Sequence, residues 1–334
     1  MKKIKTRQSL LGRVLHGWLF AMTWSVALTS ASTLAAEAYP TRPIRIVVGF
    51  APGGTTDSVA RVLSGALQQR LGQPVLIENR PGGSTQIAGE AVMRAAPDGY
   101  TLQMAASDLT ILPSTRKRPP WDALKDFTPI ARVATTGLVY TVSDRMSART
   151  LRQFVEYAKA HPGQVSYGSS GTGGILHLVG EQLRSRVSVD LLHVPYKGGS
   201  QIVQDLLGAQ IDMGVLGPID VASRQDKLHP IAQTGPTRHP LLPNVPTTAE
   251  AGFPEVKGIS MFTLIGPKGL PGAIVDRLAS EITAIMQDPA FRERLLAAGA
   301  EPSLLTGPAL TSFLAEDLRN WQEVAKASNI LIDE

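Results

Sequence analysis

Short β-branched and apolar runs alternate along this chain with longer amphipathic segments. This alternation is the strongest constraint on the fold, because strands separated by helical patterns form α/β units with parallel strands. We expect strands at residues 44–48, 75–78, 101–105, 138–142, 164–167, 191–194, 213–216, 230–232 and 259–265. We expect helices at residues 57–71, 151–160, 175–184, 201–207, 274–286, 291–298 and 309–327.

The first 38 residues have the pattern of a secretory signal peptide. Five basic residues between Lys2 and Arg13 precede an apolar stretch at 18–28, and small residues follow it. The stretch is shorter than the roughly 20 apolar residues that span a bilayer. We therefore expect cleavage after Ala38 or Ala35, with an uncleaved anchor as the second interpretation. The mature protein is then periplasmic.

The basic character of the chain belongs to this leader. Five of the 33 Lys and Arg residues and one of the 28 Asp and Glu residues lie in the first 38 positions, which leaves 28 against 27 and a net charge of +1. Such a balance does not favour nucleic-acid binding. The chain has no cysteine, so a disulfide framework, a thiol nucleophile and a cysteine metal site are excluded.

The remaining length is ample for two α/β lobes. In a clamshell of two lobes the chain commonly crosses twice, and we place the crossings near Gly137 and Gly258. This predicts lobe one at 39–137 plus 258–334 and lobe two at 138–257.

Two glycine-rich turns are the candidate binding elements. Each of them, residues 49–57 and 168–174, follows an apolar run and precedes a helical pattern. Backbone N–H groups at a helix N-terminus can hold an anion without a charged side chain. The two turns therefore predict a single ligand held between two lobes.

Other interpretations of these turns stay open. Either turn alone is also typical of a tight strand-to-helix connection. Asp57, or Thr56, is expected to cap the first helix, and Asp57 alternatively contacts a ligand amine or a water molecule. Neither turn matches a nucleotide-binding motif, and Ser170 lies outside a Gly-x-Ser-x-Gly pattern. His177 has no partner at i+4 for a metal pair, so we expect it to pack against its helix or to brace the loop.

Several stretches resemble the Bug family, also called TctC, which comprises the solute-binding receptors of tripartite tricarboxylate transporters. The resemblance runs in family order through the whole mature chain. It is carried by VVGFAPGGTTD (47–57), ENRPG (78–82), APDGYTL (96–102), YGSSGTG (167–173), HVPYKG (193–198) and LPNVPTTAEAG (242–252). The chain departs from the family at residues 81–86, at 216–219 and at Met261, and these departures leave the ligand's identity open.

This resemblance implies a type II-like periplasmic-binding-protein fold, with two α/β sheets and a ligand cleft between them. It also implies that the first turn holds a ligand carboxylate and that the second contributes from the other lobe. The implied ligand-binding residues are Phe50, Ala51, Gly53, Gly54, Thr55 and Asp57, then Ser169, Gly171, Thr172, Gly173 and Gly174, with Ser107 and Gly217 as further candidates.

The resulting hypothesis is a monomeric receptor that binds a small carboxylate without chemistry, cofactor or metal. Its partners would be the membrane permease subunits of a tripartite transporter. A periplasmic sensor that feeds a two-component system through a membrane kinase is the alternative. An exported hydrolase using Ser169 or Ser170 ranks last, because no base lies at a recognisable spacing.

Overall fold

The computed structural model describes residues 39–327 and 330–332. The predicted signal peptide therefore lies outside the described residues. Arg42–Glu334 form one compact unit, and the fold described below is that of this unit. In the other unit, Met1–Thr41, the described residues 39–41 form no helix or strand.

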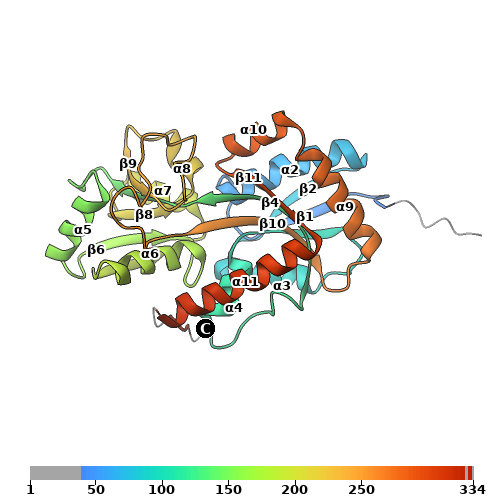
Figure 1. Cartoon of the computed structure of the whole chain (residues 1–334), viewed down its shortest axis with the longest axis horizontal. Coiled ribbons are helices and arrows are strands. Elements are labelled where there is room, and N and C mark those ends of the chain that lie inside the picture. Colours follow the sequence, from blue (N-terminus) through green and yellow to red (C-terminus); the bar gives the residue numbers. More distant parts are fainter. Residues whose placement is uncertain (1–38, 328–329, 333–334) are drawn as a thin grey trace, which may run out of the picture. The chain divides into compact units, whose positions relative to one another are not determined.

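Two sheets organise the compact unit (Figure 1). The first has six strands in the order β11-β4-β10-β3-β1-β2. Its strands are β1 (Ile44–Val48), β2 (Val75–Asn79), β3 (Thr101–Ala105), β4 (Phe127–Gly137), β10 (Ile259–Pro267) and β11 (Glu301–Thr306). The second has five strands in the order β7-β6-β8-β5-β9. Its strands are β5 (Val139–Ser143), β6 (Val165–Ser169), β7 (Leu191–Pro195), β8 (Met213–Leu216) and β9 (Leu228–Gln233).

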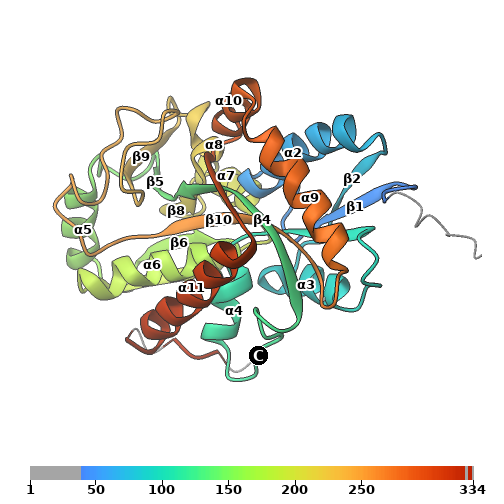
Figure 2. The ribbon, with the colours of Figure 1, turned by 45° about the vertical axis from the view of Figure 1, so that its right-hand side comes forward.

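Helices fill most connections. They are α2 (Thr55–Leu71), α3 (Gln86–Met93), α4 (Asp108–Thr115), α5 (Leu151–Ala160), α6 (Ile175–Arg186), α7 (Gly199–Leu207), α8 (Pro218–Ala222), α9 (Gly272–Ile285), α10 (Pro289–Ala297) and α11 (Gly307–Ala327). The seven predicted helices lie within two residues of the expected bounds, whereas α3, α4 and α8 were not predicted. A short 3₁₀ helix, η1 (Gly83–Thr85), precedes α3. In Figure 2, α11 lies along α4, where Thr110 donates a hydrogen bond of 2.6 Å to Asp317.

The prediction of two α/β sheets is confirmed, but both sheets are mixed. Strand β1 pairs in parallel with β2 and β3, and β6 pairs in parallel with β7 and β8. Strand β10 runs antiparallel to β3 and β4, β11 runs antiparallel to β4, and β5 runs antiparallel to β8 and β9. The expectation of parallel pairing is therefore wrong for β4, β5 and β9–β11. Among those strands, β4 and β5 border the first connection between the two sheets, and β9 and β10 border the second.

The chain passes from one sheet to the other through a single residue. Strand β4 ends at Gly137 and β5 begins at Val139, so only Leu138 separates them. The return follows β9, and β10 begins at Ile259. The five-stranded sheet is thus formed by one continuous stretch, β5 to β9, and the six-stranded sheet by the stretches before and after it. Because Ile259 pairs with Gly137, the start of β10 lies beside the end of β4.

Each sheet has its own buried apolar cluster. Tyr140, Phe154 and Tyr167 belong to the cluster of the five-stranded sheet, and Trp121 and Phe127 to one cluster of the six-stranded sheet. Burial of such large side chains is the main favourable term for each layer. Within residues 39–327 and 330–332, no helix is both long and apolar enough to cross a membrane.

Candidate functional site

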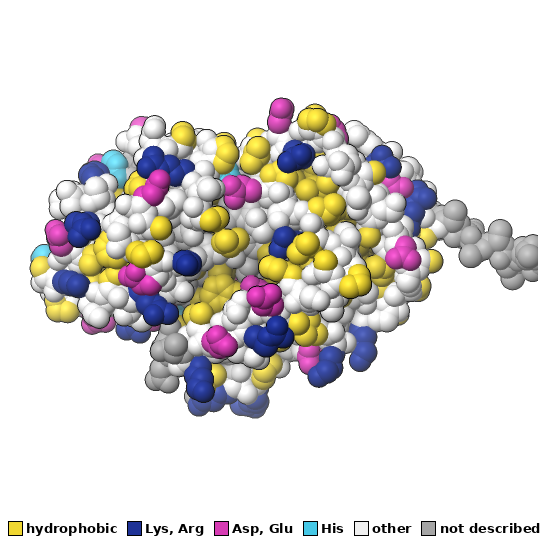
Figure 3. Space-filling view, in the orientation of Figure 1, with side chains coloured by type: hydrophobic (Ala, Val, Ile, Leu, Met, Phe, Trp, Pro, Cys, Tyr) yellow, Lys and Arg dark blue, Asp and Glu magenta, His cyan; other side chains and the backbone are white. Residues whose placement is uncertain are grey.

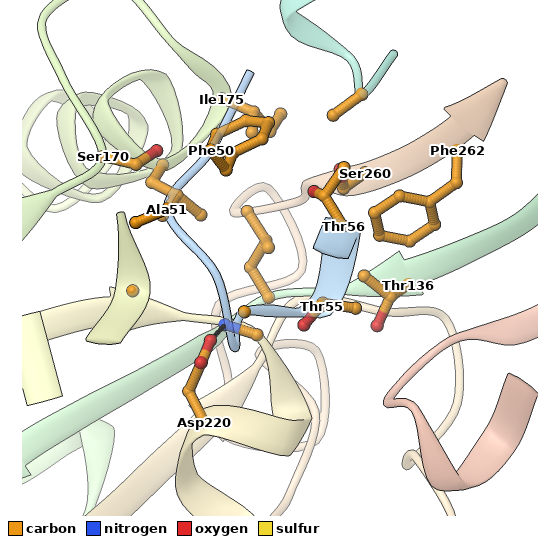
Figure 4. A pocket seen from close by; sticks show the side chains of 16 residues that line it. Phe50, Ala51, Thr55, Thr56, Thr136, Ser170, Ile175, Asp220, Ser260 and Phe262 are labelled. Atoms are coloured by element: carbon orange, nitrogen blue, oxygen red, sulfur yellow. Dashed lines mark hydrogen bonds between the residues drawn. The ribbon is translucent and has the colours of Figure 1, made fainter. Parts of the chain in front are cut away.

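A cavity of about 50 Å³ opens where the connections of the two sheets meet (Figure 4). The six-stranded sheet contributes the turn after β1, the start of α2 and parts of β4 and β10, and the five-stranded sheet contributes the starts of α6, α7 and α8. The lining residues are Phe50, Ala51, Gly54, Thr55, Thr56, Ala106, Thr136, Leu138, Ser170, Ile175, Leu176, Gly199, Gly217, Asp220, Ser260 and Phe262.

The first turn places the N-terminus of α2 at this cavity. Helix α2 begins at Thr55, and its N-cap is Gly54, which has no side chain to cap the helix. The expectation that Thr56 or Asp57 caps the helix is therefore wrong, because the extended backbone at Gly54 allows two further residues to turn into helix. The first N–H groups of a helix have no acceptor inside it, so they are available to a bound anion.

Thr55 adds a hydroxyl group to this helix start. The residue is 8% exposed, and its Oγ1 has no hydrogen-bond partner among the described residues. An unsatisfied buried hydroxyl normally costs free energy. A ligand oxygen in the cavity would supply the missing partner.

Asp57 braces the turn instead of lining the cavity. Its carboxylate accepts hydrogen bonds from the Gly53 N–H at 3.0 Å, from Arg61 at 2.9 Å and from Asn79 at 2.9 Å. Burial alone would raise the pKa of Asp57, but the hydrogen bonds from Arg61, Gly53 and Asn79 outweigh it and lower the pKa. Gly53 itself is exposed at a φ of 93°, outside the cavity lining.

The second turn divides between two cavities. Ser170 lines the first cavity, is 5% exposed, and has an Oγ without a partner in the part of the chain that the structure describes. Gly171 and Thr172 line a neighbouring cavity of about 200 Å³, which Ser170 also borders. Gly173 and Gly174 instead pack closely on Thr115 and Asp108.

Asp108 occupies the N-terminus of α6, where the sequence predicts a ligand anion. Its Oδ1 accepts a hydrogen bond of 3.0 Å from the Ile175 N–H, and the residue is 1% exposed. Burial raises the pKa of Asp108 to about 7, although the hydrogen bond from Ile175 opposes this rise. The carboxyl group of α4 thus fills the helix end that the second turn presents.

Ser169 lies outside the cavity lining and contacts the ring of His193. Its Oγ lies 2.7 Å from Nε2 of His193 and 3.2 Å from the Gly171 carbonyl oxygen. The sequence does not reveal this partner, because 24 residues separate it from Ser169 in the chain and parallel pairing of β6 with β7 joins them. Ser169 is fully buried, and neither residue lines the cavity. The pair therefore offers no exposed nucleophile.

His177 braces the second turn, as predicted. Its Nδ1 accepts a hydrogen bond of 3.0 Å from the Gly173 N–H, and its ring lies 4.0 Å from that of His193. Burial lowers the pKa of both histidines to about 4. Both rings are therefore neutral near pH 7, which allows Nδ1 of His177 to act as an acceptor.

The two further candidates have different positions. Ser107 accepts a hydrogen bond of 3.0 Å from the Met261 N–H and ties α4 to β10 outside the cavity lining. Gly217 does line the cavity, and its N–H donates to Asp220 at 3.1 Å (Figure 4). Burial raises the pKa of Asp220 to about 6.

Of the predicted residues, the structure brings Phe50, Ala51, Gly54, Thr55 and Gly217 to this cavity. Several residues that line the cavity lie outside the sequence motifs described above. Ser260 and Phe262 have the i, i+2 spacing of one strand face, a signal that the sequence does contain. Leu138 and Asp220 had no such signal, because their place depends on how the two sheets meet.

Comparisons with known proteins agree on one family. Residues 59–330 match the family described as the tripartite tricarboxylate transporter family receptor, TctC. Protein BugT of Bordetella pertussis is 33% identical over 89% of this chain and 92% of its own length. The structure of periplasmic binding protein BugD is 32% identical, with a TM-score of 0.83, over 87% of this chain and 99% of that one. R. palustris Rpa4515 with adipate is 29% identical, with a TM-score of 0.84, over 88% and 100%.

Proposed function

This chain belongs to the tripartite tricarboxylate transporter receptor family, TctC, and from that premise we propose that it captures a small carboxylated organic molecule in the periplasm and delivers it to a membrane transporter. The solved structure of a relative, R. palustris Rpa4515 with adipate, supports the first half of this proposal. We also propose that its partners are the membrane permease subunits of a tripartite transporter, that the receptor is a monomer, and that its leader is cleaved.

One observation carries the proposal. Thr55 begins α2, after β1 of the six-stranded sheet, and Ser170 follows β6 of the five-stranded sheet. Both residues line one cavity, and both have buried hydroxyl groups that lack a partner among the described residues. Hydrogen bonds from hydroxyl and backbone N–H groups to a carboxylate contribute about 1.5–3 kcal/mol each. A few such bonds are enough for micromolar binding.

We propose that capture involves closure of two lobes, residues 39–137 plus 258–334 and residues 138–257. Hydrogen bonds already join these two parts of the chain. Ser84 donates a hydrogen bond of 2.7 Å to the Thr172 carbonyl oxygen, and Thr115 donates one of 3.3 Å to the Gly173 carbonyl oxygen. A ligand that touches both lobes favours the closed arrangement over the open one. The transporter would then recognise the closed form.

The surface in Figure 3 fits a small-molecule partner better than a nucleic acid. On that face the Lys and Arg side chains are interspersed with Asp and Glu side chains. A nucleic-acid site needs a basic patch or stripe, and the mixture of charges over most of this face does not favour one.

Thermal unfolding with a panel of carboxylates tests the proposal. A ligand that binds only the folded state stabilises it by about 2.7 kcal/mol at 100 times its Kd, so at least one mono-, di- or tricarboxylate should raise the Tm by several degrees. The uncharged amides of the same acids are the control. If no compound of the panel shifts the Tm, the binding proposal is wrong.

Delivery needs a second measurement. Cells that lack this receptor should lose uptake of the radiolabelled acid that gives the largest Tm shift, and the gene supplied in trans should restore it. If uptake stays normal while transcription no longer responds to the same acid, the receptor serves a sensor and the transport part of the proposal is wrong.

A further inference from the structure

Several helices begin at the cavity. Carboxyl groups of the protein itself already lie at the starts of α6, α7 and α8. Asp108 accepts the hydrogen bond of the Ile175 N–H at the start of α6. Asp220 accepts the hydrogen bond of the Gly217 N–H before α8. The same carboxyl group lies next to Gly199 at the start of α7, where an added Cβ would be 2.8 Å from its Oδ2. Negative charge at a helix N-terminus is stabilising. These positions therefore do not need an anion from a ligand.

Helix α2 is the exception. Its cap, Gly54, has no side chain, and Asp57 bonds to the Gly53 N–H outside the cavity. Beside this helix end lies the Thr55 hydroxyl, and Ser170 faces the same cavity from the other sheet; both are more than nine-tenths buried and unpartnered among the described residues. Among the helices that begin at this cavity, α2 is thus the one whose N-terminus is left for a ligand carboxylate.

The rest of the lining is unsuited to a second charge. Its large side chains are apolar, namely Phe50, Leu138, Ile175, Leu176 and Phe262. Among the described residues that line it there is no Lys, Arg or His, and the only ionisable group is the carboxyl of Asp220. Within this cavity, a second ligand carboxylate would lose its water without a counter-charge and would face Asp220. Arg116 and Lys197 line the neighbouring cavity, which Ser170 also borders, and not this one.

We propose that the ligand is a small monocarboxylate with an apolar body, its carboxylate at the N-terminus of α2 and its body against Phe50 and Phe262. This rests on the proposed function, since it specifies the ligand of the same cavity. Since the cavity measures only about 50 Å³, we expect the two lobes to move apart to admit this body.

Four six-carbon compounds test the proposal by calorimetry on the purified protein. Hexanoate has one carboxylate, adipate adds a second at the far end, 2-aminohexanoate adds an ammonium group, and hexanamide has no charge. We expect hexanoate to bind roughly tenfold or more tightly than adipate and hexanamide, because an unpaired buried charge or a lost charge-assisted hydrogen bond costs at least that much. We also expect it to bind more tightly than 2-aminohexanoate, because the carboxyl of Asp220 already accepts the hydrogen bond of the Gly217 N–H.

Two variants locate the effect within the cavity. Thr55→Val keeps the side-chain shape and should weaken hexanoate about tenfold, whereas Thr311→Val, at an exposed position of α11, should leave its affinity unchanged. Asp220→Asn keeps a side chain that can cap α8 and removes the charge. It should shift the ratio of adipate to hexanoate affinity towards adipate, which a purely structural role would not do.

The outcomes separate this inference from the proposed function. Adipate binding as tightly as hexanoate would overturn the monocarboxylate assignment and leave the receptor function standing. Preference for 2-aminohexanoate would overturn it in favour of an amino acid whose ammonium group pairs with Asp220. If none of the four compounds and no other acid of the wider panel binds, both proposals are wrong.

Discussion

Asp108 changes the interpretation of the second glycine-rich turn, because this buried carboxyl group occupies the place expected for a ligand anion. The turn at 168–174 has the composition of an anion cradle, yet its helix end is already occupied by Oδ1 of Asp108. Gly174 is required there for space, because a Cβ would lie 2.6 Å from that oxygen. The carboxyl group from α4 therefore acts as an internal counterpart of a ligand and ties α4 to α6.

We expect Asp108 to make stability depend on pH. Burial raises its pKa in the folded protein from 3.8 to about 7, so its contribution to stability is fully present below pH 3.8 and is lost as the pH rises through 7. Relative to Asp108→Asn, the wild type should lose about 2–3 kcal/mol between pH 5 and pH 8. Urea unfolding of both proteins at the two pH values measures this difference.

The matched control is Asp226→Asn, at an exposed position, which should follow the wild type at both pH values. Asp220 and the buried histidines also titrate differently in the folded protein. They are common to all three proteins and cancel in the comparison. A difference between wild type and Asp108→Asn that stays constant with pH would contradict the prediction.

Among the elements, the turn between β1 and α2 depends on Asp57. Asp57→Asn should lower the free energy of unfolding by about 1–2 kcal/mol, because hydrogen bonds from Gly53, Arg61 and Asn79 are weakened. Ligand affinity should change by less than about threefold, since Asp57 does not line the cavity. Urea unfolding and calorimetry on the same variant measure the two effects. A large loss of affinity at unchanged stability would instead mean that Asp57 contacts the ligand.

The sequence predicts a strand well where the local residue pattern is typical of strands, and poorly where it is not. Strands β1, β3 and β8 have the predicted bounds, because their apolar runs are bounded by turn residues. The prediction omits β4 and β11, both of which contain proline, normally excluded from strand interiors. Pro129 is accommodated in β4 beside a shift in its register with β10, and Pro302 lies next to a similar shift at the sheet edge.

The residues of the candidate site fall into the same two groups, those that a local sequence pattern predicts and those that it does not. Phe50, Thr55 and the other residues of the first turn are recognisable, because a local sequence pattern produces the helix start at which they lie. The partners that complete the cavity come from residues far apart in the chain. Asp108 meets Ile175 across 67 positions, and Leu138 reaches the cavity only because β4 and β5 belong to different sheets. Such positions depend on tertiary packing, which no local pattern encodes.

For the molecule as a whole, the question is how a ligand reaches a cavity this small. Ala51 follows β1 of the six-stranded sheet, and Gly198 precedes α7 on the five-stranded side; a Cβ on Gly198 would lie 3.2 Å from that of Ala51. The two backbones therefore touch beside the cavity. If the sheets must separate to admit ligand, a covalent bond at this contact should close the entrance.

The double variant Ala51→Cys with Gly198→Cys provides that bond. The chain has no cysteine of its own, Gly198 has an extended φ of 170° that other residues adopt, and Cβ atoms in disulfides lie about 3.5–4.5 Å apart, so a small adjustment suffices. We expect the oxidised variant to exchange ligand at least tenfold more slowly than the same protein after reduction, because entry requires separation of the sheets. Exchange of a radiolabelled acid measures both states, and the two single-cysteine variants control for the effect of each side chain. Equal exchange rates in the oxidised and reduced protein would mean that the ligand enters without separation of the sheets, and closure would then play no part in capture.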